Sequence, residues 1–214
     1  MKTYLLTIQK LQKLMLGISI GILMILPTIS AFRPEMLPAK VMSMLFTISL
    51  SSVFFVMAIR PLADIFPTVS WIRPLVILRK GFGVFSASII VSLFLGKIMA
   101  NGFGYLTILG TPEYWSLSKY ALLAHLGDLT GIVLLITSNS FSKRILGLWW
   151  KRIQKLAYVY FYAGALYELF AFYSAPAFVA LGTITLLVLI AFTKNMSRRL
   201  VESTTAQPML SRTL

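Results

Sequence analysis

Six stretches of this 214-residue sequence are apolar enough, and nearly long enough, to cross a lipid bilayer. A transmembrane helix needs about 20 consecutive, mostly apolar residues. A helix also satisfies its backbone hydrogen bonds within one segment, as lipid requires. The sequence therefore predicts an all-α, polytopic membrane protein, a bundle of six transmembrane helices. The six apolar runs are residues 14–32, 41–59, 81–100, 120–138, 153–173 and 175–193.

Composition agrees with a lipid environment. Hydrophobic residues make up 58% of the chain and charged residues 12%, whereas charged residues are about 25% of ordinary soluble domains. Six apolar runs in 214 residues leave no room for a soluble domain. We therefore expect a cytoplasmic N-terminal segment over residues 1–13, a transmembrane domain over 14–193, and a polar, disordered cytoplasmic tail over 194–214.

Basic residues are distributed unevenly among the connections between the runs. The chain has 20 Lys and Arg against six Asp and Glu, for a net charge of +14. In a soluble protein this excess is typical of nucleic-acid binding, but here the cations lie between apolar runs, so we expect no nucleic-acid partner. Sixteen of the 20 lie in the N-terminal segment, the second–third and fourth–fifth connections and the tail. Because cytoplasmic loops are rich in Lys and Arg, both termini are predicted to be cytoplasmic.

The first apolar run admits a second interpretation. It follows a basic start and ends near the small residues Ser30 and Ala31, as a cleaved signal peptide would. The run is long and continues to Phe32, which favours an uncleaved transmembrane helix.

Residues with reactive side chains are few. The sequence has no cysteine and one histidine, which excludes disulfides, iron–sulfur clusters, thiol catalysis and zinc sites of the usual Cys/His type. The single histidine has no evident Ser partner with which to form a catalytic triad. The sequence therefore predicts no metal site and identifies no catalytic residue.

Four ionisable residues fall inside the predicted spans: Lys97, His125, Asp128 and Glu168. A charged group inside a bilayer costs about 2.5–3.5 kcal/mol on insertion scales and usually faces the protein interior. His125 and Asp128, three residues apart, share one helix face. A rise of about 1.5 Å per residue places all four in the outer half of the bilayer. They form either a polar site for a proton, an ion or a small polar ligand, or a set of structural ion pairs.

Small residues recur at four-residue spacing in several runs. Helices in lipid associate by close packing at such residues, so we expect helix contacts there. The positions are Gly17 and Gly21, Ser88, Ser92 and Gly96, and Gly127 and Gly131.

Four short segments, taken in order, resemble those of a known family. Residues 58–62 (Ala-Ile-Arg-Pro-Leu) end the second run, and residues 78–80 (Leu-Arg-Lys) open the third, followed by Gly83. Residues 134–138 (Leu-Leu-Ile-Thr-Ser) end the fourth run, and residues 150–158 (Trp-Lys-Arg-Ile-Gln-Lys-Leu-Ala-Tyr) open the fifth. Together, over residues 40–195, they resemble the ferric reductase-like transmembrane domain family, and within it the heme-binding membrane subunit of the bacterial methionine sulfoxide reductase system.

This resemblance implies a six-helix electron-transfer subunit of an oxidoreductase in the bacterial inner membrane. Such proteins hold b-type heme between His side chains on the third and fifth helices, and they exchange electrons with a redox partner protein or the quinone pool. The family's ligand positions correspond to Gln154 and Tyr167 on the fifth helix, and to a position near Ser92 or Leu93 on the third. None of these residues is His here, although Tyr ligates heme iron in some proteins.

Two functional hypotheses follow from the sequence. The first is a ferric reductase-like membrane protein that either transfers electrons in a divergent form, with heme b held at Tyr167 or Gln154, or has lost heme and kept the scaffold. The second is a heme-free membrane module. It would bind a partner protein, a proton or ion, or a small polar ligand through the cluster of Lys97, His125, Asp128 and Glu168.

Overall fold

A computed structural model describes residues 2–116 and 120–210 of the chain. Over these ranges the protein is helical and contains no strand, which confirms the predicted all-α class. Its longer helices are α1 (Lys2–Phe32), α2 (Ala39–Ile65), α4 (Leu78–Asn101), α6 (Ala121–Thr137), α9 (Leu156–Phe172) and α10 (Ala175–Leu210). Short helical pieces connect them: η1 (Pro34–Met36), α3 (Ile72–Leu75), α5 (Phe103–Ile108), η2 (Pro112–Trp115), α7 (Ser140–Leu146) and α8 (Leu148–Ile153).

Four of the described helices are long and apolar enough to cross a membrane: Thr3–Phe32, Ala39–Ile65, Ile72–Asn101 and Ala175–Ser197. A fifth is counted if α6 and α7, which meet at a bend of 92°, are taken as one broken span. These helices make the chain an integral membrane protein. The structure thus shows four or five candidate spans among the described residues and does not confirm the predicted six.

The two shorter predicted spans correspond to α6 and α9, each of 17 residues. At about 1.5 Å per residue, each is about 26 Å long, short of the roughly 30 Å hydrocarbon core. Local backbone conformation sets their ends. Tyr120 precedes α6 with a φ of 59°, and Tyr173 follows α9 with a φ of 51°, a left-handed conformation that does not continue a right-handed helix.

The first and last helices extend beyond the apolar runs that predicted them. α1 starts at Lys2 rather than at residue 14, and α10 continues past residue 193 to Leu210. The apolar pattern marks only the part of a helix that lipid surrounds. Lys, Arg, Leu, Met and Gln all have high helix propensity and carry the helix beyond it.

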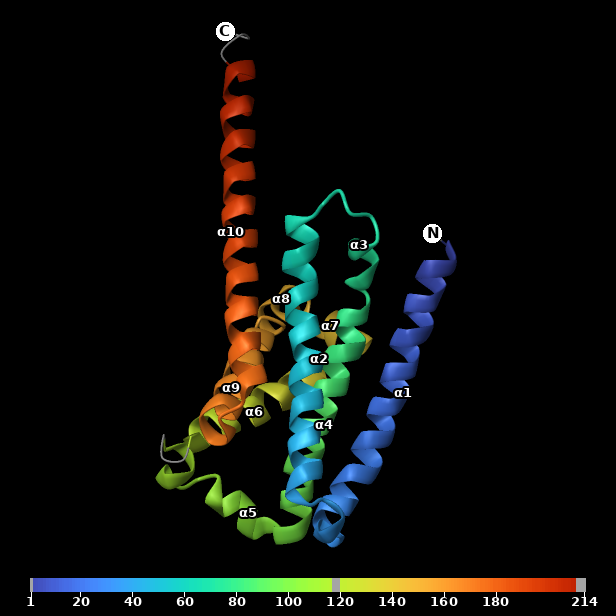
Figure 1. Ribbon diagram of the computed structural model, residues 1–214, viewed down its shortest axis with the longest axis vertical. Coiled ribbons are helices and arrows are strands. Elements are labelled where there is room, and N and C mark those ends of the chain that lie inside the picture. Colours follow the sequence, from blue (N-terminus) through green and yellow to red (C-terminus); the bar gives the residue numbers. More distant parts are fainter. Residues whose placement is uncertain (1, 117–119, 211–214) are drawn as a thin grey trace.

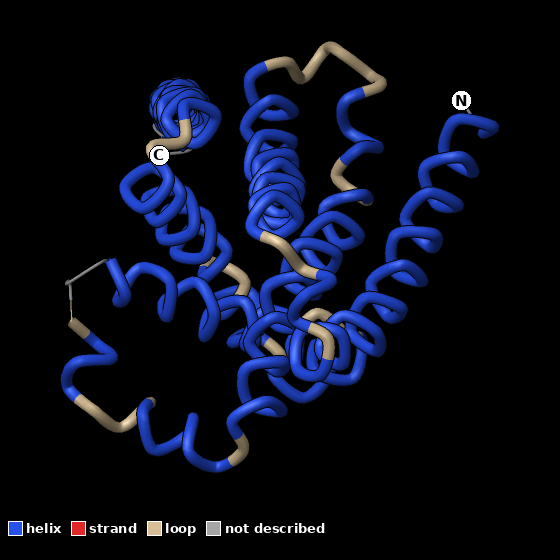
Figure 2. Tube along the Cα trace, turned by 60° about the horizontal axis from the view of Figure 1, so that its bottom comes forward, coloured by secondary structure: helices blue, strands red, loops and turns tan. Residues whose placement is uncertain are grey.

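The long helices lie in a row, with α1 on one flank, α9 and α10 on the other, and α2 and α4 between them (Figures 1 and 2). The main buried cluster is formed by α2, α6, α9 and α10 and includes Val53, Phe161, Ala165 and Ile184. Large apolar side chains such as Met24 and Phe178 point outward, 74% and 67% exposed. In lipid such exposure is ordinary, because the solvent is as apolar as the side chains.

Small residues allow close packing of α4 against α1, most tightly at Gly96. A Cβ atom added at Gly96 would lie 2.6 Å from Ser30 Cβ and 3.2 Å from the Pro27 carbonyl oxygen. The expected close contact is therefore present at Gly96. It is not present at Gly17 or Gly21, where an added Cβ meets nothing within 4 Å.

We predict that Gly96→Ala lowers stability by about 1–3 kcal/mol, because α1 and α4 must move apart. Gly21→Ala is the matched control, and it should be neutral or stabilising by up to about 1 kcal/mol through helix propensity. Unfolding of both variants in detergent measures the difference. Equal effects at the two positions would contradict the packing described here.

Candidate functional site

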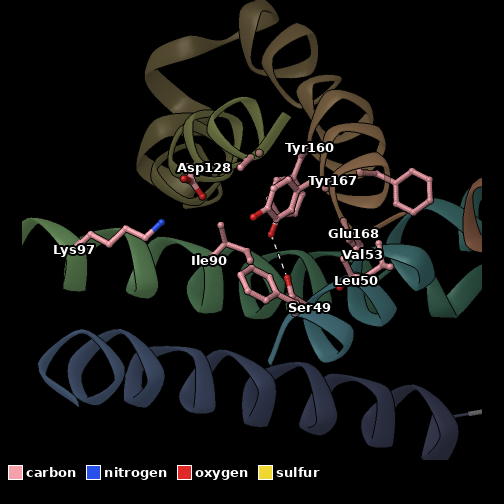
Figure 3. A pocket seen from close by; sticks show the side chains of 14 residues that line it. Ser49, Leu50, Val53, Ile90, Lys97, Asp128, Tyr160, Tyr167 and Glu168 are labelled. Atoms are coloured by element: carbon pink, nitrogen blue, oxygen red, sulfur yellow. Dashed lines mark hydrogen bonds between the residues drawn. The ribbon is translucent and has the colours of Figure 1, made fainter. Parts of the chain in front are cut away.

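A cavity of about 100 Å³ lies among α2, α4, α6 and α9, and its lining residue Lys97 is near the end of α4 that leads into α5 (Figure 3). A cavity of this size in a polar setting has room for a few water molecules. Its walls carry ionisable and hydroxyl side chains as well as apolar ones. The polar lining residues are Ser49, Lys97, Asp128, Tyr160, Tyr167 and Glu168.

Three of the four ionisable residues singled out in the sequence line this one cavity. Lys97 comes from α4, Asp128 from α6 and Glu168 from α9. In Figure 3, Lys97 and Asp128 lie on one side of Tyr160 and Glu168 on the other, with the Lys97 side chain extended toward α6. Of the two alternatives left open by the sequence, ion pairing among these three residues is not seen. Among the described residues, no salt bridge joins any two of these three side chains.

Glu168 is the most deeply buried of the three, with 6% of its surface exposed. No described side chain or backbone group forms a hydrogen bond with its carboxyl group; only its backbone oxygen accepts bonds, from the amides of Tyr173 and Ser174. Burying an unpartnered carboxyl group is unfavourable. Such a group is therefore better explained by a ligand or by water in the cavity than by folding.

His125 lies behind Asp128 rather than in the cavity. Its Nδ1 is 3.8 Å from Asp128 Oδ2, too far for a hydrogen bond, and this buried nitrogen has no hydrogen-bond partner among the described residues. Its ring stacks on Tyr114, with the ring centres 3.4 Å apart, and meets Trp115 edge to face. A second cavity of about 40 Å³ is lined by His125, Asp128 and these two aromatic rings, so Asp128 borders both cavities.

Tyr114 belongs to η2, in the connection before α6. Its hydroxyl pairs with that of Tyr105 at 3.2 Å. Burial is the main cause that raises the pKa of Tyr114, and the hydrogen bond with Tyr105 raises it further. The phenol therefore stays neutral where it stacks on the imidazole ring of His125. The sequence analysis missed Tyr114, because nothing in a loop sequence shows which helix its side chain will cover.

A hydroxyl network forms one wall of the cavity. The Tyr160 hydroxyl lies 2.9 Å from Ser86 Oγ and 3.4 Å from Ser49 Oγ, and the two serines are 2.8 Å apart. Figure 3 shows the Tyr160–Ser49 pair in the cavity wall. This network joins α2, α4 and α9, and it supplies neutral oxygen atoms beside the charged groups. Sequence reasoning missed all three residues, since Ser and Tyr occur in many apolar helices.

The positions that correspond to heme ligands in the resembling family do not face one another. Gln154 donates its side-chain amide to Thr137 Oγ1 at 3.2 Å, and Ser92 donates to the Ile22 carbonyl of α1 at 3.3 Å. Tyr167 lines the cavity and packs edge to face on Phe172. An amide, a hydroxyl and a phenol directed to three different neighbours do not form an axial ligand set, so these residues do not fit a heme.

No group of three or more His, Cys, Asp or Glu within residues 2–116 and 120–210 is arranged to hold a metal ion. No protein-family model, no curated protein and no solved structure matches this chain. The chemistry of the site is therefore inferred from the side chains that line the cavity. Two carboxyl groups, one ammonium and three hydroxyls around a small cavity can hold a positively charged group or relay a proton.

We predict that Glu168→Gln raises the free energy of unfolding by about 1–3 kcal/mol, because it removes an ionisable group buried without a partner. For a chain of this size, the melting temperature should rise by about 2–4 °C per kcal/mol. Glu113→Gln, an exposed carboxylate in η2, is the control and should change little. A destabilised Glu168→Gln variant would show that the carboxyl group has a stabilising partner.

Proposed function

We propose that this integral membrane protein binds a small cation, down to a proton, in the cavity between α2, α4, α6 and α9. One observation carries the proposal. Asp128 and Glu168, from different helices, open into the same cavity, and among the described residues that line it Lys97 alone carries a positive charge. With both carboxyl groups ionised, the site has a net charge of about −1, which favours a positively charged occupant.

The size of the cavity limits the ligand. Pockets for drug-sized molecules have volumes of about 300–1,000 Å³, whereas this cavity has about 100 Å³. A monovalent metal ion, an ammonium ion or a proton carried by water matches that volume. A larger organic substrate does not.

The side chains around the cavity would have different roles in binding the cation. Asp128 and Glu168 supply the negative charge, and the hydroxyls of Tyr160 and Ser49 supply neutral oxygens that replace water around a cation. Lys97 offsets one of the two negative charges when the cation is absent. His125 contacts Asp128 from the side away from the cavity and lines the second cavity, so it would lie on the route between the cation site and the η2 connection.

Ligand-linked stabilisation tests the site. At constant ionic strength, with choline as the replacement cation, we expect sodium, potassium or ammonium chloride to raise the melting temperature of the purified protein. Binding at 100 times Kd contributes about 2.7 kcal/mol. A separate assay tests protons. The protein is placed in liposomes that contain a pH-sensitive dye, and the dye reports whether protons pass when a proton gradient is imposed.

Asp128→Asn should abolish the response of the wild type in whichever assay shows one, because the amide keeps the shape and removes the charge. Glu35→Gln, an exposed acid in η1, should leave the response unchanged. The proposal is wrong if the wild-type protein responds to none of these cations and passes no protons.

We propose further that the chain has the ferric reductase-like scaffold without its heme chemistry. Support for the scaffold comes from the four matching segments and from the helix order, in which α4 and α9 stand at the places of the third and fifth helices. The directions of Gln154, Tyr167 and Ser92 support the loss of heme.

The optical spectrum measures this directly. Protein purified from cells supplied with a heme precursor should show no Soret band and no reducible b-type spectrum. A Soret band that disappears in Tyr167→Phe would instead support electron transfer by a divergent member of the family, working with a redox partner protein.

We also propose six crossings of a bacterial inner membrane, with both termini in the cytoplasm. Figure 1 shows the start of α1, the end of α10 and the α2–α3 connection toward the same end of the molecule, as an even number of crossings requires. The excess of Lys and Arg at that end supports a cytoplasmic location. For α6 and α9, local thinning of the bilayer would accommodate their length.

A further inference from the structure

Two arginines without acidic partners lie together at the end of the bundle that carries the termini. Arg60 is near the end of α2, and Arg79 is in the first turn of α4. The Nε of Arg79 donates to the Val56 carbonyl at 2.9 Å. Because Val56 and Arg60 are four residues apart on one helix, this bond brings the two guanidinium groups to the same face of α2.

The charges of this pair are not balanced by the protein. Arg60 and Arg79 repel each other electrostatically, and Lys80, which follows, adds a third cation. Among the described residues, neither arginine forms a salt bridge with a carboxylate. Asp64, near the end of α2, instead accepts a hydrogen bond from Asn195 of α10 at 3.5 Å.

A third polar group approaches from α9. The phenol of Tyr158 lies within electrostatic reach of Arg79, and 40% of the Tyr158 surface is exposed. Arg79 is half-buried with its Nε already bonded, so its two terminal nitrogens remain as donors. Arginine donors form a planar fork that suits phosphate oxygens.

We propose that Arg60, Arg79 and Tyr158 bind the phosphate group of an anionic lipid. Arg79 stands close to the start of the apolar span Ile72–Asn101, where lipid phosphates lie. Trp71, just before that span, is 59% exposed, as is typical of aromatic residues at headgroup level. A zwitterionic headgroup carries a cationic group of its own, which the cationic side chains of this site would repel. An anionic lipid is therefore favoured.

Native mass spectrometry of the detergent-purified protein tests this proposal with two lipids, phosphatidylglycerol and phosphatidylcholine. We expect the wild type to bind one phosphatidylglycerol at least tenfold more tightly than phosphatidylcholine. Arg60→Gln should lower the affinity for phosphatidylglycerol by about tenfold, as loss of a charge-assisted hydrogen bond does. Arg144→Gln, an exposed arginine in the last turn of α7, should lower it by no more than about twofold, because only general surface charge is lost.

Arg79→Gln also removes the bond to Val56, so Arg60→Gln is the deciding variant. Equal losses of affinity for phosphatidylglycerol in Arg60→Gln and Arg144→Gln would overturn the proposal, because the lipid would then be attracted by the general positive charge of the surface. Full displacement of phosphatidylglycerol by millimolar inorganic phosphate would overturn the choice of a lipid. The cation responses of Arg60→Gln should equal those of the wild type, because Arg60 does not line the cation cavity.

Discussion

Hydrocarbon gives no hydrogen-bond partner to a backbone amide or to a carboxyl group, and the structure follows from that constraint. Every long segment is helical, so its backbone is satisfied internally. Apolar side chains remain on the outside without penalty. Ionisable side chains, in contrast, gain from any position that faces other protein groups, and Lys97, Asp128 and Glu168 share one cavity between four helices. The same solvent that makes the surface unusual thus concentrates the polar chemistry inside.

Charged side chains gather at two places along the bundle, and the two places have opposite charge. Nearer α5, two carboxyl groups outnumber one ammonium and lie beside the hydroxyls of Tyr160 and Ser49. At the end that carries the termini, Arg60 and Arg79 lie together without an acid. Neither place is fully charge-balanced by the described side chains around it. We interpret the first as the site of a small cation and the second as that of a lipid phosphate.

Prediction from sequence succeeded where one physical rule acts within one segment. Runs of apolar residues located α1, α2, α4 and α10, because lipid solvation depends on composition along a single helix. The same runs overestimated α6 and α9. The left-handed residues Tyr120, just before α6, and Tyr173, just after α9, each bound one end of a helix through a local conformation that hydropathy does not measure. Counting residues from the helix ends was enough to predict that Lys97, Asp128 and Glu168 lie at a similar depth in the bilayer. The same count could not predict that His125 lies outside the cavity, where Tyr114 from the preceding connection covers it.

The amino-acid sequence by itself determined the solvent, the helical class and the uneven distribution of positive charge, because each depends on residue types summed along the chain. Only the tertiary structure decided which polar groups meet. Lys97, Asp128 and Glu168 lie on three helices, and the rotation of each helix about its axis sets whether a side chain faces the cavity, lipid or another helix. That rotation depends on contacts such as Gly96 against Ser30 and Tyr160 against Ser86. These contacts join residues far apart in the chain, and no pattern within one segment encodes them.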